Sequence, residues 1–259
     1  MTTTLLAHDS DLDAEPFVPR PIGFARLVRV EWAKGTDTRA ARWLLGLVAL
    51  TTAGTLAVPL LRPTTFEQSY ASYLQVTAVG MTILLPVVAI LMLTGEWSQR
   101  SIVTTFTQEP RRIRVLNAKL AASALLGCAG AVFGGVVVAA GIGLAAASGR
   151  ALEANLTQGV VVGYVAFVLL NVLAAVALGA LLQNSAAAIA ASFALPAAFA
   201  VLGAASPLVS DWIDTSTTWN AVLENDWAGQ VPQIIFSLVF WVLAPLAAGI
   251  VRTVRRDVV

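Results

Sequence analysis

The chain has 259 residues, of which 58% are hydrophobic and 12% are charged, and its formal net charge is +1. Soluble domains carry about 25% charged residues, so this composition excludes an ordinary soluble globular domain and is typical of a helical protein that crosses a membrane several times. With one cysteine (Cys128) and one histidine (His8), the chain can form no intrachain disulfide, and these two residues cannot build a metal site.

The first 20 residues are acidic, with four acids and no base before Arg20. They lack the basic start and short apolar core of a secretory signal, so we expect a disordered acidic tail over 1–20. We expect residues 21–259 to form a single transmembrane domain.

Residues 21–42 show helical spacing of apolar side chains. One side of the expected helix carries Phe24, Leu27, Val28, Glu31 and Trp32, and three bases lie on the other side. This pattern predicts an amphipathic helix that lies in the membrane interface, with its bases facing headgroups.

Six apolar runs follow, each near the roughly 20 residues that a helix needs to cross a bilayer. The expected fold is therefore all-α and polytopic, with six transmembrane helices. The runs cover residues 43–61, 72–94, 120–147, 156–182, 186–209 and 231–251.

A polar stretch, residues 95–119, separates the second run from the third and holds two acids and five bases. Charges in hydrocarbon cost several kcal/mol each, so we expect this stretch in water or at headgroups. Ser98 to Phe106 can form a short helix with Ile102, Val103 and Phe106 on one side. The alternative is an ordinary basic loop.

The loop between the fifth and sixth runs, residues 210–230, carries four acids, three tryptophans and no base. Tryptophans near the ends of spans often anchor at the membrane interface. We expect a short helix near residues 216–225 that lies on the outer surface.

The bases set the expected orientation. Of the 16 lysines and arginines, 14 lie in residues 1–42, 95–119 and 252–256, and the opposite loops hold only Arg62 and Arg150. The positive-inside rule then places both termini and residues 95–119 in the cytoplasm of a multi-pass plasma-membrane protein.

The sequence lacks motifs and residues that several kinds of catalysis and transport require. The chain has no G-x-x-x-x-G-K-[ST] phosphate loop, and no charged residue lies within the six runs. We therefore expect no enzyme activity from this chain alone and no ion-coupled transport through intramembrane charges. The mild polar residues in the runs, Gln75, Thr77, Tyr164, Asn171 and Ser192, are interpreted as helix–helix hydrogen bonds rather than substrate ligands.

Short motifs in a fixed order resemble the actinobacterial permeases of type-two ABC exporters. They are RVEWAK at 29–34, GEW at 95–97, PRR at 110–112, VLNAKL at 115–120 and RRDV at 255–258. With the six-span layout, the likeness covers roughly residues 22–259.

The resemblance implies the transmembrane subunit of an ATP-driven exporter, which forms the translocation path. It implies a second membrane subunit, identical or related, and two separate ATP-binding subunits that carry ATP and Mg. By the same likeness, residues 22–34 form a connecting helix. This chain would also have a coupling helix that docks on the ATPase. It would include Glu96, Arg100, Ser101, Ile102, Val103 and Phe106.

No cofactor is expected in this chain, and the expected partners besides protein subunits are membrane lipids, not nucleic acid. Two other functions remain open at this stage. One is a channel or facilitator without an ATPase partner. The other is a non-transporting membrane protein that anchors or regulates others.

Overall fold

The computed structural model describes residues 22–98, 107 and 111–255, and these residues are almost entirely helical, with one isolated β-bridge between Ser69 and Glu153. The helices are α1 (Phe24–Thr36), α2 (Arg39–Leu61), α3 (Tyr70–Ser98), α5 (Arg112–Ala147), α6 (Gln158–Leu182), α7 (Ser185–Ala205), α8 (Pro207–Trp212), α9 (Thr215–Leu223), α10 (Val231–Leu238), the π-helix η1 (Val239–Leu243) and α11 (Ala244–Arg255).

Six helices are long and apolar enough to cross a membrane: α2, α3, α5, α6, α7 and the continuous stretch Val231–Arg255. The predicted all-α architecture with six candidate spans is confirmed. The bounds differ at several ends, since α2 begins at Arg39, α3 continues to Ser98 and the last span continues to Arg255. Helix α5 begins at Arg112, before its apolar run, and the fifth span ends at Ala205 because Pro207 opens the separate helix α8.

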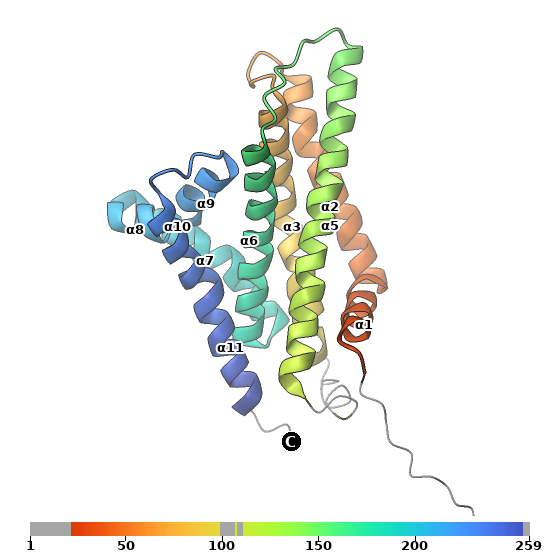
Figure 1. Ribbon diagram of the computed structural model, residues 1–259, viewed down its shortest axis with the longest axis vertical. Helices are drawn as coiled ribbons and strands as arrows, with labels where there is room; N and C mark the ends of the chain where they lie inside the picture. The colour runs from red at the N-terminus through yellow and green to blue at the C-terminus, as the bar shows by residue number, and fades with distance from the viewer. Residues whose placement is uncertain (1–21, 99–106, 108–110, 256–259) are drawn as a thin grey trace, which may run out of the picture.

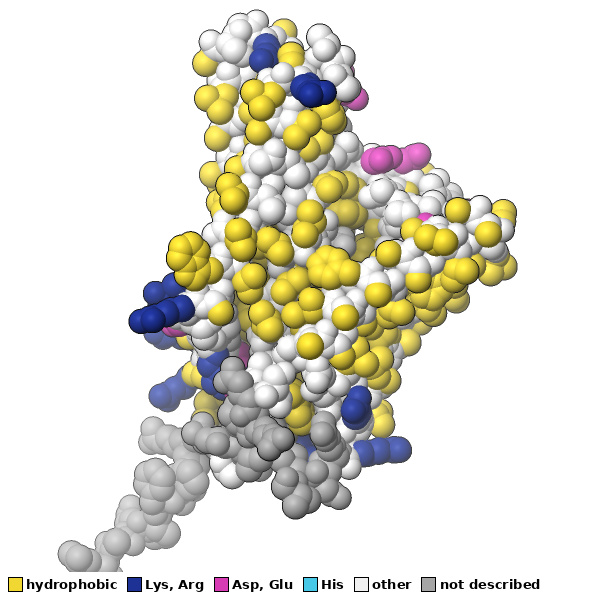
Figure 2. Space-filling view, turned by 180° about the vertical axis from the view of Figure 1, so that it is seen from behind, with side chains coloured by type: hydrophobic (Ala, Val, Ile, Leu, Met, Phe, Trp, Pro, Cys, Tyr) yellow, Lys and Arg dark blue, Asp and Glu magenta, His cyan; other side chains and the backbone are white. Residues whose placement is uncertain are grey.

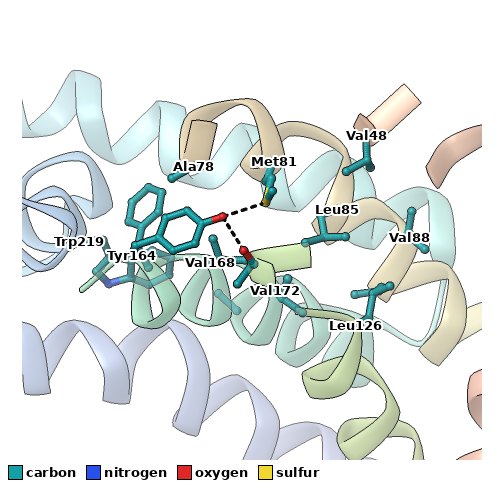
Figure 3. Packing of buried hydrophobic residues seen from close by; sticks show 14 of the residues in the cluster. Val48, Ala78, Met81, Leu85, Val88, Leu126, Tyr164, Val168, Val172 and Trp219 are labelled. Atoms are coloured by element: carbon teal, nitrogen blue, oxygen red, sulfur yellow. Dashed lines mark hydrogen bonds between the residues drawn. The ribbon is translucent and has the colours of Figure 1, made fainter. Parts of the chain in front are cut away.

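The core lies between α3, α5 and α6, which run side by side with α2 (Figure 1). Figure 3 shows this packing, in which the Tyr164 hydroxyl of α6 donates to the Ala131 carbonyl of α5 at 3.0 Å. The interpretation of Tyr164 as a helix–helix hydrogen bond is confirmed. In contrast, Asn171 and Ser192 hydrogen-bond to carbonyls of their own helices, so that interpretation was wrong for them.

The turn between α6 and α7 is as tight as the sequence requires. Gln183 adopts a left-handed conformation with φ of 52°, which ends α6. Asn184 then caps α7 by accepting a hydrogen bond from the Ala187 amide at 3.0 Å. Two residues are therefore enough to join α6 to α7.

Bases gather at one end of the molecule, which we call the basic end (Figure 2). There α2 and α5 begin, α3 and α6 end, and the described chain starts and stops (Figure 1). The bases that the structure describes near these helix ends are Arg26, Arg29, Lys34, Arg39, Arg42, Arg111, Arg112, Arg114, Lys119, Arg252 and Arg255.

Toward the opposite end, α9 packs more deeply than expected, although Ser216 and Thr217 stay exposed. Gly163 of α6 packs so closely that an added Cβ would lie 2.2 Å from the Val222 carbonyl oxygen at the end of α9. Trp219 is 3% exposed and donates its ring N–H to the Ser237 hydroxyl at 3.0 Å. The loop tryptophan Trp219 is therefore part of the packed interior.

The last span contains a π-helix. Trp241 lies in this segment, is buried, and donates its ring N–H to the Ile213 carbonyl at 2.7 Å. Pro245, which has no backbone N–H, is the second residue after this segment. Such one-turn irregularities are frequent at functional sites.

Candidate functional site

Four charged side chains meet at the basic end: Glu31 and Lys34 of α1, Glu96 of α3 and Lys119 of α5. The Lys119 ammonium donates to Glu31 Oε2 at 2.5 Å and lies 3.1 Å from Glu96 Oε2. The Lys34 ammonium donates to Glu31 Oε1 and to Glu96 Oε1, each at 2.8 Å. Each base therefore contacts both acids, and we call these four residues the charge cluster.

Local sequence explains how α1 reaches this position. Val28 and Trp32 pack against the core, and Glu31, which shares their side of the helix, is turned inward with them. Lys34 follows Glu31 by three residues, so the two side chains are neighbours on the helix surface. The amino-terminal half of α5 supplies the surface on which α1 packs.

Burial makes the charge cluster energetically important. The side chains of Lys119 and Glu31 are 4% and 6% exposed, and that of Glu96 is 16% exposed. An ion taken out of water at such a site is tolerated only when opposite charges and hydrogen bonds replace its hydration. Among the residues that the structure describes, two acids are paired with two bases here, and their contacts tie α1 to both α3 and α5.

Lys34 is the accessible member of the cluster, with a side chain that is 44% exposed. Partial burial opposes its charge, but hydrogen bonds to Glu31 and Glu96 outweigh this effect and raise the pKa of Lys34 above its ordinary value. A raised lysine pKa contributes stability that is lost only as pH rises through the folded-state pKa. The contacts of Lys34 therefore persist at neutral pH.

The cluster corrects the expectation that residues 95–119 lie entirely in water or at headgroups. Glu96 belongs to the last turns of α3, and Lys119 lies two turns inside α5, where both are largely buried. The helices continue beyond their apolar runs, and the opposite charges neutralise one another in the interior.

Sequence reasoning missed Lys119 as a site residue, although it offered a signal. Glu31 lies among apolar side chains on the predicted helix, and a buried acid needs a base. The chain has two lysines, and Lys119 directly adjoins an apolar run.

The other predicted site residues are only partly described. In α1, Phe24 is exposed, while Leu27, Val28 and Trp32 are partly buried. Of the predicted coupling residues, Glu96 is placed in α3. Residues Arg100, Ser101, Ile102, Val103 and Phe106 lie outside the described residues.

Hydrogen bonds join the remaining helices at the basic end. Ser185, at the start of α7, bonds through its hydroxyl to those of Thr94 and Ser98 of α3 at 2.7 and 2.8 Å. Gln183 donates to the Thr253 hydroxyl of α11 at 3.0 Å. These contacts extend the connection from α3 to α6, α7 and α11.

Two arginines of α5 add further links. Arg112 donates to the Thr253 carbonyl at 3.3 Å, and Arg114 donates to the Ile22 carbonyl just before α1. Hydrogen bonds and ion pairs thus link the helices at the basic end to one another. Within 22–98, 107 and 111–255, no group of three acids, cysteines or histidines could hold a metal ion.

Comparisons with protein-family models, with curated proteins and with solved structures found no match to this chain.

Proposed function

We propose that this chain is the transmembrane subunit of an ATP-driven ABC exporter, which forms the translocation path and couples to a separate ATP-binding subunit. The observation that carries the proposal is the charge cluster. Glu96 precedes the stretch between α3 and α5, Lys119 follows it, and both contact α1, Glu96 through Lys34 and Lys119 through Glu31. A displacement applied to that stretch would pass directly to α1, α3 and α5.

The proposed contact with the ATPase is the stretch itself. Ile102, Val103 and Phe106 would enter a groove on the ATP-binding subunit, with Arg100 at its rim. Helix α1 would lie in the membrane interface as the connecting helix, its exposed Arg26 and Arg29 facing headgroups. The charge cluster would keep α1 and the docked stretch moving as a unit.

The proposal places the basic end, both termini and the docking stretch in the cytoplasm, following the distribution of bases. Labelling in a Cys128→Ala background tests this orientation. A cysteine at Thr217 should react with an impermeant reagent from outside the cell, and one at Thr107 only after the membrane is opened. The reverse pattern would contradict the orientation.

Two membrane chains, identical or related, would assemble with two ATP-binding subunits that carry ATP and Mg. Helix α7 exposes apolar side chains that a second membrane chain or lipid would cover, for example Phe193, Val201 and Leu202. Its many alanines allow close contact between helices.

ATP turnover tests the proposal. The rigorously purified chain should hydrolyse no ATP, because it lacks a phosphate loop. Co-expressed with the products of neighbouring reading frames, it should purify with an ATP-binding subunit and show turnover. Turnover by the chain alone, or transport activity with no such subunit bound, would overturn the proposal.

A matched pair of variants locates the contact. Burial of Phe106 at an interface is worth about 1.5–3 kcal/mol, so Phe106→Ala should weaken binding of the ATP-binding subunit roughly tenfold or more. Ile113→Ala removes an exposed apolar side chain from the start of α5 and should leave binding unchanged. Equal effects of the two substitutions would argue against docking through the apolar side of the stretch.

A further inference from the structure

A cavity of about 170 Å³ lies where α3, α6, α7, α9 and η1 converge. Four elements each contribute a polar side chain to its lining, and two buried tryptophan rings form part of its wall. These six residues are Thr82, Asn171, Ser192, Thr215, Trp219 and Trp241.

The cavity lies near the middle of the spans. Asn171 is 13 residues from the start of α6 and 11 from its end, which places it roughly 17–20 Å from either end of the helix. Thr82 and Ser192 lie in the interior of α3 and α7. Polar side chains at this depth are costly when they face lipid, so they mark cavities and pathways.

The hydrogen bonds of these lining side chains leave acceptor capacity on their oxygen atoms. Thr82 and Ser192 donate their hydroxyl protons to Val79 and Ile189 carbonyls of their own helices, at 2.9 and 2.8 Å. Asn171 donates one amide proton to the Phe167 carbonyl at 2.9 Å, and its side-chain oxygen accepts no hydrogen bond from the described part of the chain. The Thr215 hydroxyl likewise makes none within those residues.

None of the described residues that line the cavity is charged. The ring N–H groups of both tryptophans are already used on Ser237 and Ile213, so the rings offer only flat apolar surface. The second amide proton of Asn171 and the Thr215 hydroxyl can also donate, so the lining complements an uncharged occupant that both donates and accepts hydrogen bonds and presents a face to aromatic rings.

We propose that this cavity binds an uncharged, hydrogen-bond-donating group of an amphiphilic molecule, such as a sugar hydroxyl or an amide N–H. That the molecule is the one exported rests on the proposed function. Binding of the molecule to the chain does not rest on that function, so the binding proposal and the export proposal can fail separately.

Photolabelling of the full-length chain in lipid nanodiscs, without ATP or partner subunits, tests the inference. Three amphiphilic probes are compared, each with the same alkyl chain and a diazirine next to its headgroup. The headgroup is glucose in the first, a neutral glycinamide in the second and trimethylammonium in the third. The glucose or the glycinamide probe should label peptides of α6 and α7 around Asn171 and Ser192, and the stronger of the two identifies the source of the donor group. Equal labelling by trimethylammonium, or no labelling by either neutral probe, would overturn the proposal.

Matched threonine substitutions separate recognition from nonspecific partition into the membrane. Thr82→Val combined with Asn171→Leu removes two acceptors, so neutral-probe labelling should fall on the order of tenfold. Thr55→Val removes a hydroxyl with the same own-helix bond, to the Thr52 carbonyl at 3.0 Å, but lies on α2 outside the cavity. It should leave labelling unchanged.

The single variant Ser192→Ala provides a second, milder test in case the double variant fails to insert. Labelling that stays at the level of the unchanged chain in both cavity variants, each eluting as a folded protein, would contradict recognition by these side chains.

Discussion

Replacing Lys119 with methionine should destabilise the folded chain by about 3–5 kcal/mol, because it removes the buried base that contacts two carboxylates at a largely buried site. Methionine keeps much of the length and apolar character of the lysine side chain, so the loss reports the charge. Reversible unfolding in mixed detergent micelles measures the change in free energy.

Lys34→Met is the matched control, because it removes the same group from the same two carboxylates. Since Lys34 is half-exposed, water can replace part of its charge, so this change should cost less than Lys119→Met. Similar losses for the two variants would show that burial does not give Lys119 its importance.

A second substitution should rescue part of the loss. Glu31→Gln added to Lys119→Met removes the buried acid that lost its partner, so the double variant should be more stable than Lys119→Met alone. Strictly additive losses would contradict direct pairing between these two side chains.

Gly163→Ala should destabilise the chain by roughly 1–3 kcal/mol, because the added Cβ would meet the backbone oxygen of Val222 at 2.2 Å. Backbone cannot rotate away as a side chain can, so α9 must move off α6. The same unfolding measurement detects the change. Photolabelling of the cavity should also fall, because α9 carries Thr215 and Trp219.

The control is Gly135→Ala in α5, where nothing lies within 4 Å of the added Cβ. Alanine is the better helix former by about 0.5–1 kcal/mol, so this variant should be neutral or slightly more stable. A loss equal to that of Gly163→Ala would mean that helix propensity or lipid contact, and not the approach of α9, decides the outcome.

The six candidate spans could be predicted from the sequence because hydrocarbon imposes a length of about 20 apolar residues on any helix that crosses it. The charged residues at the ends of the helices made the helix bounds harder to predict. Helix α5 has 36 residues and a length of about 54 Å, so its first turns extend past the hydrocarbon and carry Arg112 and Arg114. Apolar runs alone do not reveal such extensions.

The charge cluster could not be predicted, because Glu31 and Lys119 are 88 residues apart and no periodicity specifies which acid meets which base. No spacing in the sequence indicates that Glu96 lies beside Lys34 and Lys119. Partners across helices follow from how the helices pack, which the sequence pattern leaves open.

The close packing of α9 against α6 could also not be predicted from the sequence. Four acids and three tryptophans in residues 210–230 indicate a loop at the membrane surface, and the helix itself was expected. The missing information is the close approach at Gly163, together with the hydrogen bonds of Trp219 and Trp241 that hold this region inward.

Native mass spectrometry of the ATP-hydrolysing complex, released from mild detergent, tests most directly the claim that this chain is one of two membrane subunits in an ATP-driven assembly. The account predicts two membrane chains, identical or related, together with two ATP-binding subunits. An active complex with a single membrane chain, or one that contains no ATP-binding subunit, would contradict it.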